Sequence, residues 1–336
     1  MKNLLFLLFS YFVSFISFGQ NITGFVYDAK TKNPIESATA YFDGTTMGDA
    51  TDENGYFEIP NAFSVESVMI ISILGYETQY IPFENIQKEM KIYLNESSFD
   101  LEEVSLDADN MSREEKMKYF KKEFLGKNFE SSSLQILNEK KIILRYFSED
   151  NTISASCPEA LVIKNDILGY NISYNLISFD IQLENGYKGK KYIKSVLFTG
   201  TSYFSNIENL KKKHLKKRKK AYLGSRLHFL RSLVRGDFVE HKFNFIHNGF
   251  TFKNPENFIQ KKQQTEEATI FELQEKRIAI LYNNDKQSVL EIREKDKTFS
   301  VDSFGNISPP NKVLFGGEMS FKRIGEMLPL DYQLEN

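Results

Sequence analysis

Residues 21–96 are divided into short stretches of alternating apolar and polar side chains, and turn residues separate them roughly every eight to twelve positions. ITGFVYD at 22–28 has this alternation, and Asn54-Gly55 is a typical hairpin step. SVMIISIL at 67–74 is apolar on both faces, which suits a strand in the centre of two packed sheets. About seven short strands with frequent turns predict a β-sandwich over residues 20–97.

An ordered string of small, aromatic and turn-forming residues runs through the same stretch. Its members are Gly24, Val26, Asp28, Thr31, Pro34, Ile35, Ala38, Ala40, Gly44, Thr45, Thr51, Asp52, Gly55, Phe57, Ile59, Ser72, Leu74, Gly75 and Tyr76. In this order the residues resemble the carboxypeptidase regulatory-like domain, and the resemblance implies a seven-stranded Greek-key sandwich of the transthyretin-like type. The sandwich also resembles the extension that precedes TonB-dependent outer-membrane transporters. Those transporters continue into a plug and a long barrel, for which the roughly 240 residues that follow are too few.

Lys2 is followed by a long apolar run, and small residues stand just before Gln20. This layout predicts a signal peptide over residues 1–19. The competing interpretation is a retained transmembrane anchor, but the apolar run of about 15 residues is shorter than the roughly 20 that span a bilayer. The only cysteine is Cys157, so an exported chain would fold without an internal disulfide. We expect export to the periplasm or to the outer membrane or cell surface, with no transmembrane helix in the mature chain.

The polar residues 98–111 are predicted to form a linker. Ser112, with Glu115 three residues later, forms a capping box that predicts a helix through Phe124. Strand-like segments then follow one another, from KIILRYF and YNISYNLISFDIQL to ATIFELQ and RIAILYN near the end of the chain. Residues 112–336 are therefore predicted to form one β-rich α+β domain with a basic helical insertion, and the whole chain belongs to the α+β class.

The insertion lies at 206–235, which contains eleven Lys or Arg and one acid, whereas residues 21–96 contain four basic and twelve acidic residues. Glycine and proline are nearly absent through 206–223, so a helix is predicted. Apolar residues recur after Gly224 at three- and four-residue steps, at Leu227, Leu230, Leu233 and Val234. We expect a helix anchored at its C-terminal end with its cationic end in water. LGYNISY (168–174) and KKRKKAYLGSRLHFLRSL (216–233) resemble the tail that follows the sandwich in a group of exported bacterial proteins, which implies architecture and export but no chemistry.

Eight residues of the basic run are candidates for contact with an anionic surface: Lys211, Lys212, Lys213, Lys216, Lys217, Arg218, Lys219 and Lys220. Four interpretations compete: a solvated helix face with no partner, a nucleic-acid site, contact with anionic lipid or lipopolysaccharide, and docking on an acidic protein face of this chain or a partner. The nucleic-acid interpretation is the weakest of the four. An exported protein is separated from the nucleic acids of the cytoplasm, and Tyr222 is the only aromatic residue among the basic ones that could stack on a base. An envelope protein or an anionic surface is the expected partner.

The sequence predicts no catalytic, cofactor-binding or metal-ligating residues. Its four histidines lack the spacing of a zinc peptidase site, and Ser225 with His228 has no strand-turn-helix elbow and no orienting acid. The acidic stretch from Asp49 to Glu58 departs from the calcium-loop pattern at Ala50 and Asn61, so a hairpin turn is predicted there.

These features predict a non-enzymatic, exported binding or scaffold protein of the cell envelope, in which the sandwich is a structural or interaction module. Two alternatives stay open. One is a carbohydrate or peptide hydrolase whose carboxylates converge only in the folded chain. The other is an accessory subunit of an outer-membrane uptake or assembly complex.

Overall fold

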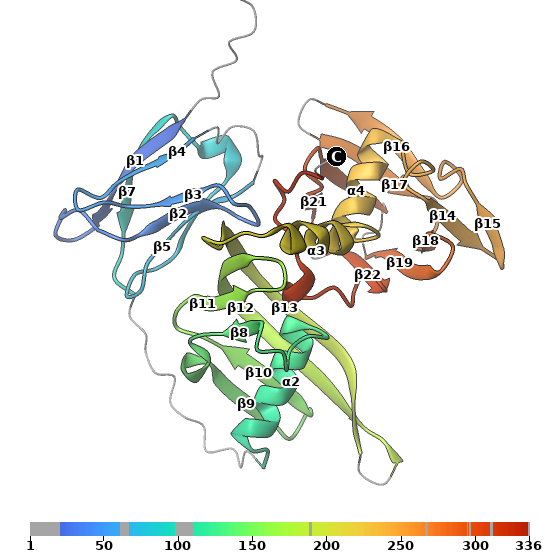
Figure 1. Ribbon diagram of the computed structural model, residues 1–336, viewed down its shortest axis with the longest axis horizontal. Helices are drawn as coiled ribbons and strands as arrows, with labels where there is room; N and C mark the ends of the chain where they lie inside the picture. The colour runs from blue at the N-terminus through green and yellow to red at the C-terminus, as the bar shows by residue number, and fades with distance from the viewer. Residues whose placement is uncertain are drawn as a thin grey trace, which may run out of the picture.

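The computed structural model describes residues 21–60, 67–97, 110–187, 190–265, 268–293, 297–309 and 312–334, together with Lys295. The predicted signal peptide and most of the predicted linker lie outside these residues. Three units surround helix α3 (Lys212–Tyr222): the N-terminal sandwich, a second unit that contains helix α2, and a C-terminal unit that contains helix α4 (Figure 1). No helix in the described part of the chain has the length and apolar composition to cross a bilayer.

The N-terminal unit has two facing sheets, β4-β1-β7 and β3-β2-β5-β6. Its strands are β1 (Ile22–Asp28), β2 (Thr39–Phe42), β3 (Gly48–Ala50), β4 (Tyr56–Ile59), β5 (Met69–Ser72), β6 (Gln79–Ile81) and β7 (Glu89–Leu94). Every second residue of β1 is buried, as its alternation predicts. Val26, Phe42 and Phe57 are fully buried between the sheets, so the apolar faces of short strands supply the core.

The acidic stretch of the sandwich forms a turn whose carboxylates bind backbone groups. Asp52 Oδ1 accepts hydrogen bonds from the N–H groups of Asn54 and Tyr56, at 2.9 and 2.8 Å. Gly55 has φ +75° and lies against the carbonyl of Val26, where a Cβ would come within 2.5 Å of the oxygen. The predicted turn is therefore confirmed, but it is not a hairpin, because the strands that it joins, β3 and β4, lie in different sheets.

The second unit is one helix packed on an antiparallel sheet. Its elements are α2 (Arg113–Leu125), β8 (Leu134–Ile136), β9 (Ile143–Phe147), β10 (Thr152–Ser156), β11 (Leu161–Asn165), β12 (Tyr170–Asn185) and β13 (Lys191–Asn206). The Ser112 hydroxyl accepts the N–H of Glu115 at 3.1 Å, which confirms the predicted cap. Phe120 and Phe124 of α2 pack on the sheet, with ring centroids 4.7 Å from Phe179 and 5.1 Å from Tyr174.

The C-terminal unit has two further sheets, β15-β14-β18-β19-β22 and β16-β17-β20-β21, packed against α4 (Arg226–Arg235). Its strands are β14 (Phe243–His247), β15 (Phe250–Phe252), β16 (Ile259–Gln264), β17 (Ala268–Leu273), β18 (Arg277–Tyr282), β19 (Lys286–Ile292), β20 (Thr298–Asp302), β21 (Ile307–Ser308) and β22 (Val313–Gly317). Phe229, Leu230 and Leu233 of α4 lie in its core. This core is separate from that of the second unit, although the sequence predicted one domain for residues 112–336.

The basic segment forms two helices rather than the one predicted. Gly224 has φ +71°, a conformation that ends α3, and a Cβ at this position would come within 2.5 Å of the Tyr282 ring. The next residue, Ser225, caps α4 by accepting the N–H of His228 at 3.1 Å. The expectation of one helix anchored only at its C-terminal end is therefore wrong, because the apolar stripe after Gly224 belongs to a different helix.

The sandwich docks on the second unit through the turn after β2. Gly44 N–H donates to the carbonyl of Ser202 at 2.7 Å, and Phe204 N–H donates to the carbonyl of Thr45 at 2.9 Å. These bonds add a short parallel bridge, Thr45 to Tyr203, to the outer edge of β13. The Tyr41 hydroxyl completes the contact at 3.0 Å from the hydroxyl of Thr201. The sandwich is thus held by backbone bonding at a strand edge.

Candidate functional site: a lysine-rich helix face

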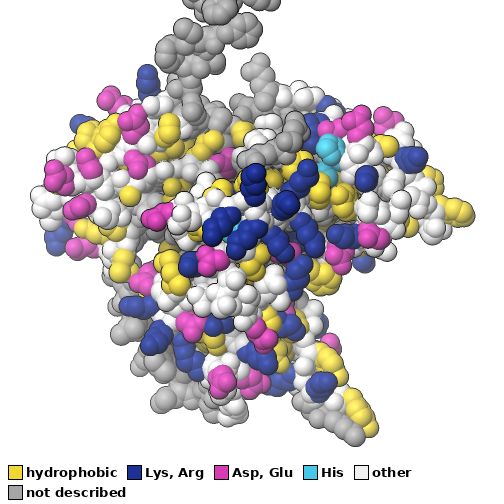
Figure 2. Space-filling model, in the orientation of Figure 1, with side chains coloured by type: hydrophobic (Ala, Val, Ile, Leu, Met, Phe, Trp, Pro, Cys, Tyr) yellow, Lys and Arg dark blue, Asp and Glu magenta, His cyan; other side chains and the backbone are white. Residues whose placement is uncertain are grey.

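Seven of the eight predicted contact residues are exposed on or beside α3. They are Lys211, Lys212, Lys213, Lys216, Lys217, Lys219 and Lys220, and we call them the lysine face. Figure 2 shows basic side chains gathered over α3, near the centre of the view. The predicted surface site is therefore one contiguous cationic patch at the place where the three units meet.

The lysine face is not neutralised within the described part of the chain, because none of its residues forms an ion pair there with Asp or Glu. The first turn of α3 has no acidic residue, although acids stabilise this end of a helix. Lysines four residues apart, such as Lys212 with Lys216, repel each other by about 0.2–0.5 kcal/mol per pair. These charges do not serve the stability of the helix.

The opposite face of α3 is buried through an unusual stripe. His214, Arg218, Ala221 and Tyr222 lie at three- and four-residue steps, and each is less than a tenth exposed. Two of these four residues, His214 and Arg218, are polar. A search for a stripe of apolar residues therefore finds no buried face on this helix. The four-residue step from His214 to Arg218 to Tyr222 is the signal that could have located this face.

Arg218 was predicted as a surface contact, and that prediction is wrong. Its guanidinium is buried: Nε donates to the carbonyl of Leu168 at 2.7 Å, and Nη2 donates to the carbonyl of Gly169 at 2.8 Å. Nη2 also donates to Asn206 Oδ1 at 2.7 Å, and the guanidinium lies 3.5 Å from the centroid of the Tyr170 ring. Arg218 therefore fixes the helix to the second unit, so the lysine face is presented on a rigid base.

Arg218 also joins the two stretches, 168–174 and 216–233, that resemble the tail of a group of exported bacterial proteins. Leu168, Gly169 and Tyr170 begin the first stretch, and Arg218 lies in the second, 50 residues later. Gly169 has φ +72°, and a Cβ there would come within 2.7 Å of Leu210 Cδ1 and 3.0 Å of His214 Nδ1. The two stretches form one structural contact between the turn that joins β11 to β12 and the basic helix.

Both ends of α3 are fixed by further bonds. His214 Nδ1 accepts the N–H of Lys211 at 3.0 Å, which requires an unprotonated Nδ1, and burial lowers the pKa of His214 below its usual value. At the other end, Lys322 Nζ donates to the carbonyl of Ala221 at 2.6 Å. Burial lowers the pKa of Lys322 to about 8. A cation at a helix C-terminus is favourable, so Lys322 strengthens the anchored end.

A pair formed by His228 of α4 and His241, which lies between α4 and β14, was not predicted, because 13 residues separate the two. His228 Nε2 lies 3.1 Å from His241 Nδ1, and His241 Nε2 lies 3.3 Å from Asp237 Oδ2. His228 Nδ1 accepts the N–H of Gly224 at 3.1 Å, so the neutral ring carries its proton on Nε2. Burial, with a smaller contribution from His241, lowers the pKa of His228 to about 3. No group of His, Cys, Asp or Glu in the described residues has the geometry of a metal site.

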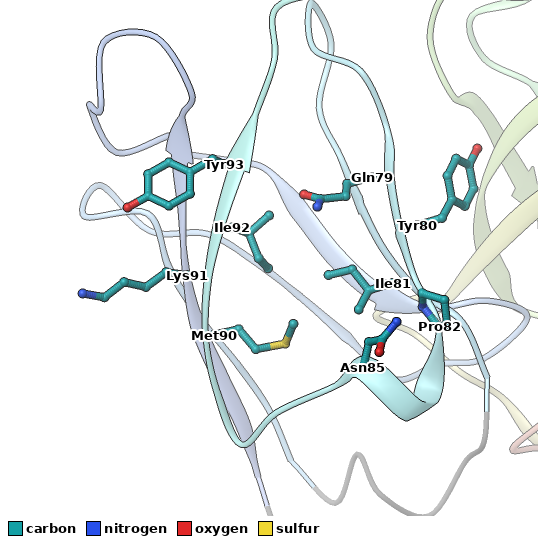
Figure 3. Close-up of a pocket in the computed structure, with 9 residues that line it drawn as sticks. All are labelled: Gln79, Tyr80, Ile81, Pro82, Asn85, Met90, Lys91, Ile92 and Tyr93. Carbon is teal, nitrogen blue, oxygen red and sulfur yellow. The ribbon is translucent and has the colours of Figure 1, made fainter.

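Two shallow pockets lie on the described surface. One, of about 410 Å³, lies between the edge strands β6 and β7 of the sandwich, where Figure 3 shows Met90, Ile92 and Ile81 directed into the space and Tyr93 directed away. The other, of about 340 Å³, lies between β3 and the second unit. Its lining includes one carboxylate, Asp49, whose oxygens accept backbone N–H groups at 2.9 Å. Neither pocket is lined by a pair of carboxylates.

The contact between the sandwich and the second unit contains a carboxylate with a raised pKa. Asp43 Oδ1 accepts the N–H of Ser202 at 2.7 Å. Part of Asp43 reaches the surface, but its carboxyl lies among the buried Tyr41 and Tyr174 side chains, and desolvation raises its pKa to about 6 against the lowering effect of the Ser202 and Gly44 N–H groups. Asp43 therefore changes charge near neutral pH at the point where the sandwich is held.

Comparison with protein families gives a match at the N-terminal unit. Residues 22–106 match the CarboxypepD_reg-like domain, which confirms the resemblance seen in the sequence. The TonB-dependent receptor SusC of Bacteroides thetaiotaomicron is 32% identical over 105 residues, which are 31% of this chain and 10% of the receptor. The match therefore spans a tenth of the length of that relative.

Two solved structures overlap parts of the chain. A cohesin–X-dockerin complex from Acetivibrio cellulolyticus is 25% identical over 22% of this chain and 51% of its own, with a TM-score of 0.18. A 9R-lipoxygenase from Cyanothece is 12% identical over 66% of this chain and 48% of its own, also with a TM-score of 0.18.

Proposed function

Because residues 22–106 form a carboxypeptidase regulatory-like domain, we propose that this chain is a non-enzymatic, exported scaffold of the cell envelope. The sandwich, in the Greek-key arrangement of transthyretin-like modules, is fixed to the second unit, and the lysine face binds an anionic surface. The phosphates of lipid head groups or of lipopolysaccharide are the groups that seven unpaired lysines would attract. The match to a TonB-dependent receptor supports a place in the envelope.

One observation carries this proposal: the lysine face is exposed and unpaired, while Arg218 inside the same run is buried and fully used. Charges needed for folding would have partners within the chain, as Arg218 does. The seven lysines repel one another and have no described counter-charge, so their charges are available to an anionic partner.

Replacing Lys216, Lys217, Lys219 and Lys220 with glutamine should weaken binding to anionic vesicles about tenfold. Each lysine near such a surface contributes up to about 1 kcal/mol, and only some of the four can touch a plane at once. Folding should be unchanged or slightly better, because like charges are removed. Flotation with phosphatidylglycerol-containing vesicles, at low and high salt, measures the first effect, and thermal unfolding measures the second.

Phosphatidylcholine vesicles and purified lipopolysaccharide provide the other arms of that experiment. Wild-type binding should be absent on neutral vesicles, and it should fall with added salt because the Debye length shrinks from about 10 Å at 0.1 M to 3 Å at 1 M. Equal binding of neutral and anionic vesicles would refute the proposal. So would unfolding of the glutamine variant, which would assign the lysines an internal role.

The accessory-subunit alternative has one supporting observation, the receptor match, which covers the sandwich. Under this alternative the lysine face binds an acidic surface of a partner protein, and it does not bind the phosphates of lipids or lipopolysaccharide. Co-purification with a membrane complex that persists in mild detergent, after lipid is removed, would favour it. The hydrolase alternative would need two carboxylates close together in a pocket. Neither of the two pockets described above is lined by such a pair, so this alternative has no supporting observation.

A further inference from the structure

The outer edge of β13 is a strand edge that is only half used. In its sheet, β12 pairs with β11 and β10 along one side and with β13 along the other, so β13 is the edge strand. The C-terminal part of this edge pairs with the sandwich at Gly44 and Thr45. The preceding part, residues 191–200, has no backbone partner beyond β12 in the described chain. One end of the edge therefore already accepts an added segment.

The direction of the free backbone groups follows from the occupied end. Ser202 and Phe204 direct their N–H groups away from β12, toward Asp43 and Thr45. Backbone direction alternates along a strand, so Val196, Phe198 and Gly200 present their N–H and carbonyl groups on the same side. Three residues in register offer the ladder that an extended peptide needs.

The side chains along this edge have no neighbouring strand on their outer side within the described residues. Val196 and Phe198 pack against the core of the second unit but stay partly exposed, and on the opposite face Leu197 is 61% exposed. A strand added beside β13 would cover apolar surface on both faces. Figure 1 shows this half of the β12–β13 hairpin extending away from the sandwich and the C-terminal unit.

The charge along the free edge of β13 indicates which kind of strand could bind there. Residues 190–200 contain Lys190, Lys191 and Lys194 and no acid. Lys191 is used by Tyr146, with Nζ donating to its hydroxyl at 2.6 Å, whereas Lys194 is exposed on the bulge of β13 and has no described partner. A second copy of this chain would bring the same lysines and no carboxylate. An acidic segment would pair with Lys194 while its apolar residues cover Val196 and Phe198.

We propose that the free edge of β13, residues 191–200, binds an extended, acidic and apolar segment of a partner protein by strand addition, in line with the sandwich contact at residues 202–204. This surface is distinct from the lysine face, and the binding is set by backbone pairing rather than by phosphates. The two proposals can therefore fail separately.

The test uses the full chain and a fluorescent nonapeptide in which valine alternates with glutamate and threonine. Wild type should bind it, and amide exchange at Val196, Phe198 and Gly200 should slow on binding. Val196→Pro removes one outward N–H, a change that an edge strand tolerates, and should weaken binding at least tenfold. Lys194→Glu should weaken it about fivefold and confer binding of a matching peptide with lysine in place of glutamate.

Circular dichroism checks that both variants fold, and Lys194→Glu keeps the test valid if the proline variant does not. A peptide with proline at its centre should not bind wild type. Failure of wild type to bind the acidic peptide would overturn the proposal. Equal binding by Lys194→Glu, or dimerisation of the chain through this edge in sedimentation experiments, would overturn it as well.

Discussion

Arg218→Ala should lower the free energy of unfolding by about 3–4 kcal/mol, while Lys217→Ala at the adjacent position should change it by less than about 0.5 kcal/mol. Both variants remove one positive charge from the same helix. Arg218 satisfies the carbonyls of Leu168 and Gly169, which stay buried and unpaired when it is removed. It also stacks on Tyr170 at 3.5 Å, a desolvated contact worth up to about 2 kcal/mol.

Urea-induced unfolding followed by circular dichroism, with anionic-vesicle binding of the same proteins, separates the two roles. Lys217→Ala should weaken binding, by less than the four-lysine variant does, without losing stability. Arg218→Lys should lie between wild type and alanine, because an ammonium cannot reproduce the planar fork that spans Leu168, Gly169 and Asn206. If Arg218→Ala and Lys217→Ala prove equally stable, then α3 is not held through its buried arginine.

Asp43→Asn should raise the free energy of unfolding at pH 7 by roughly 2 kcal/mol. In the wild type, desolvation raises the pKa of Asp43 to about 6 from its ordinary value of 3.8, so the folded chain binds this proton more tightly than the unfolded chain. The stability that this proton contributes is fully present below about pH 4 and is lost as pH rises through 6. Asparagine keeps an oxygen for the Ser202 N–H but never carries the charge.

The Asp43→Asn variant should therefore show a flatter dependence of stability on pH between 4 and 7 than the wild type. Asp49→Asn is the matched control. Asp49 lies in the same sheet and binds backbone N–H groups of Ala50 and Glu58, so the substitution should give no gain in stability at pH 7. Denaturant titrations of the three proteins at pH 4.5 and 7 make the comparison. A wild type whose stability rises from pH 4.5 to 7 relative to Asp43→Asn would contradict the expected sign.

Local patterns predicted much of the fold, because their causes lie within a few residues. The alternation in β1, the turn at Asp52 and the cap at Ser112 are all confirmed at their expected residues. Each depends on backbone geometry that one short segment determines by itself. The resemblance to the carboxypeptidase regulatory-like domain rests partly on the same residues, since Asp52 and Gly55 belong to the string that carries it.

Features that depend on distant partners were missed. Arg218 has its partners 49 and 50 residues earlier in the chain, so its sequence neighbours, all lysines, gave a misleading impression of exposure. Gly224 divides the basic segment at a positive φ, and the Tyr282 ring leaves no room for a side chain there, which no local periodicity records. Asp43 is an ordinary turn residue until β13 of another unit covers it.

The central claim is that the chain acts at an anionic surface outside the cytoplasm, held there by the lysine face. Fractionation of cells that express the full chain, followed by a high-salt wash of the envelope fraction, tests it most directly. We predict recovery of the protein in the envelope fraction, release by high salt, and poor retention of the four-lysine glutamine variant in low salt. Recovery of intact protein in the cytosol, or envelope retention that neither salt nor the glutamine substitutions alter, would contradict the account.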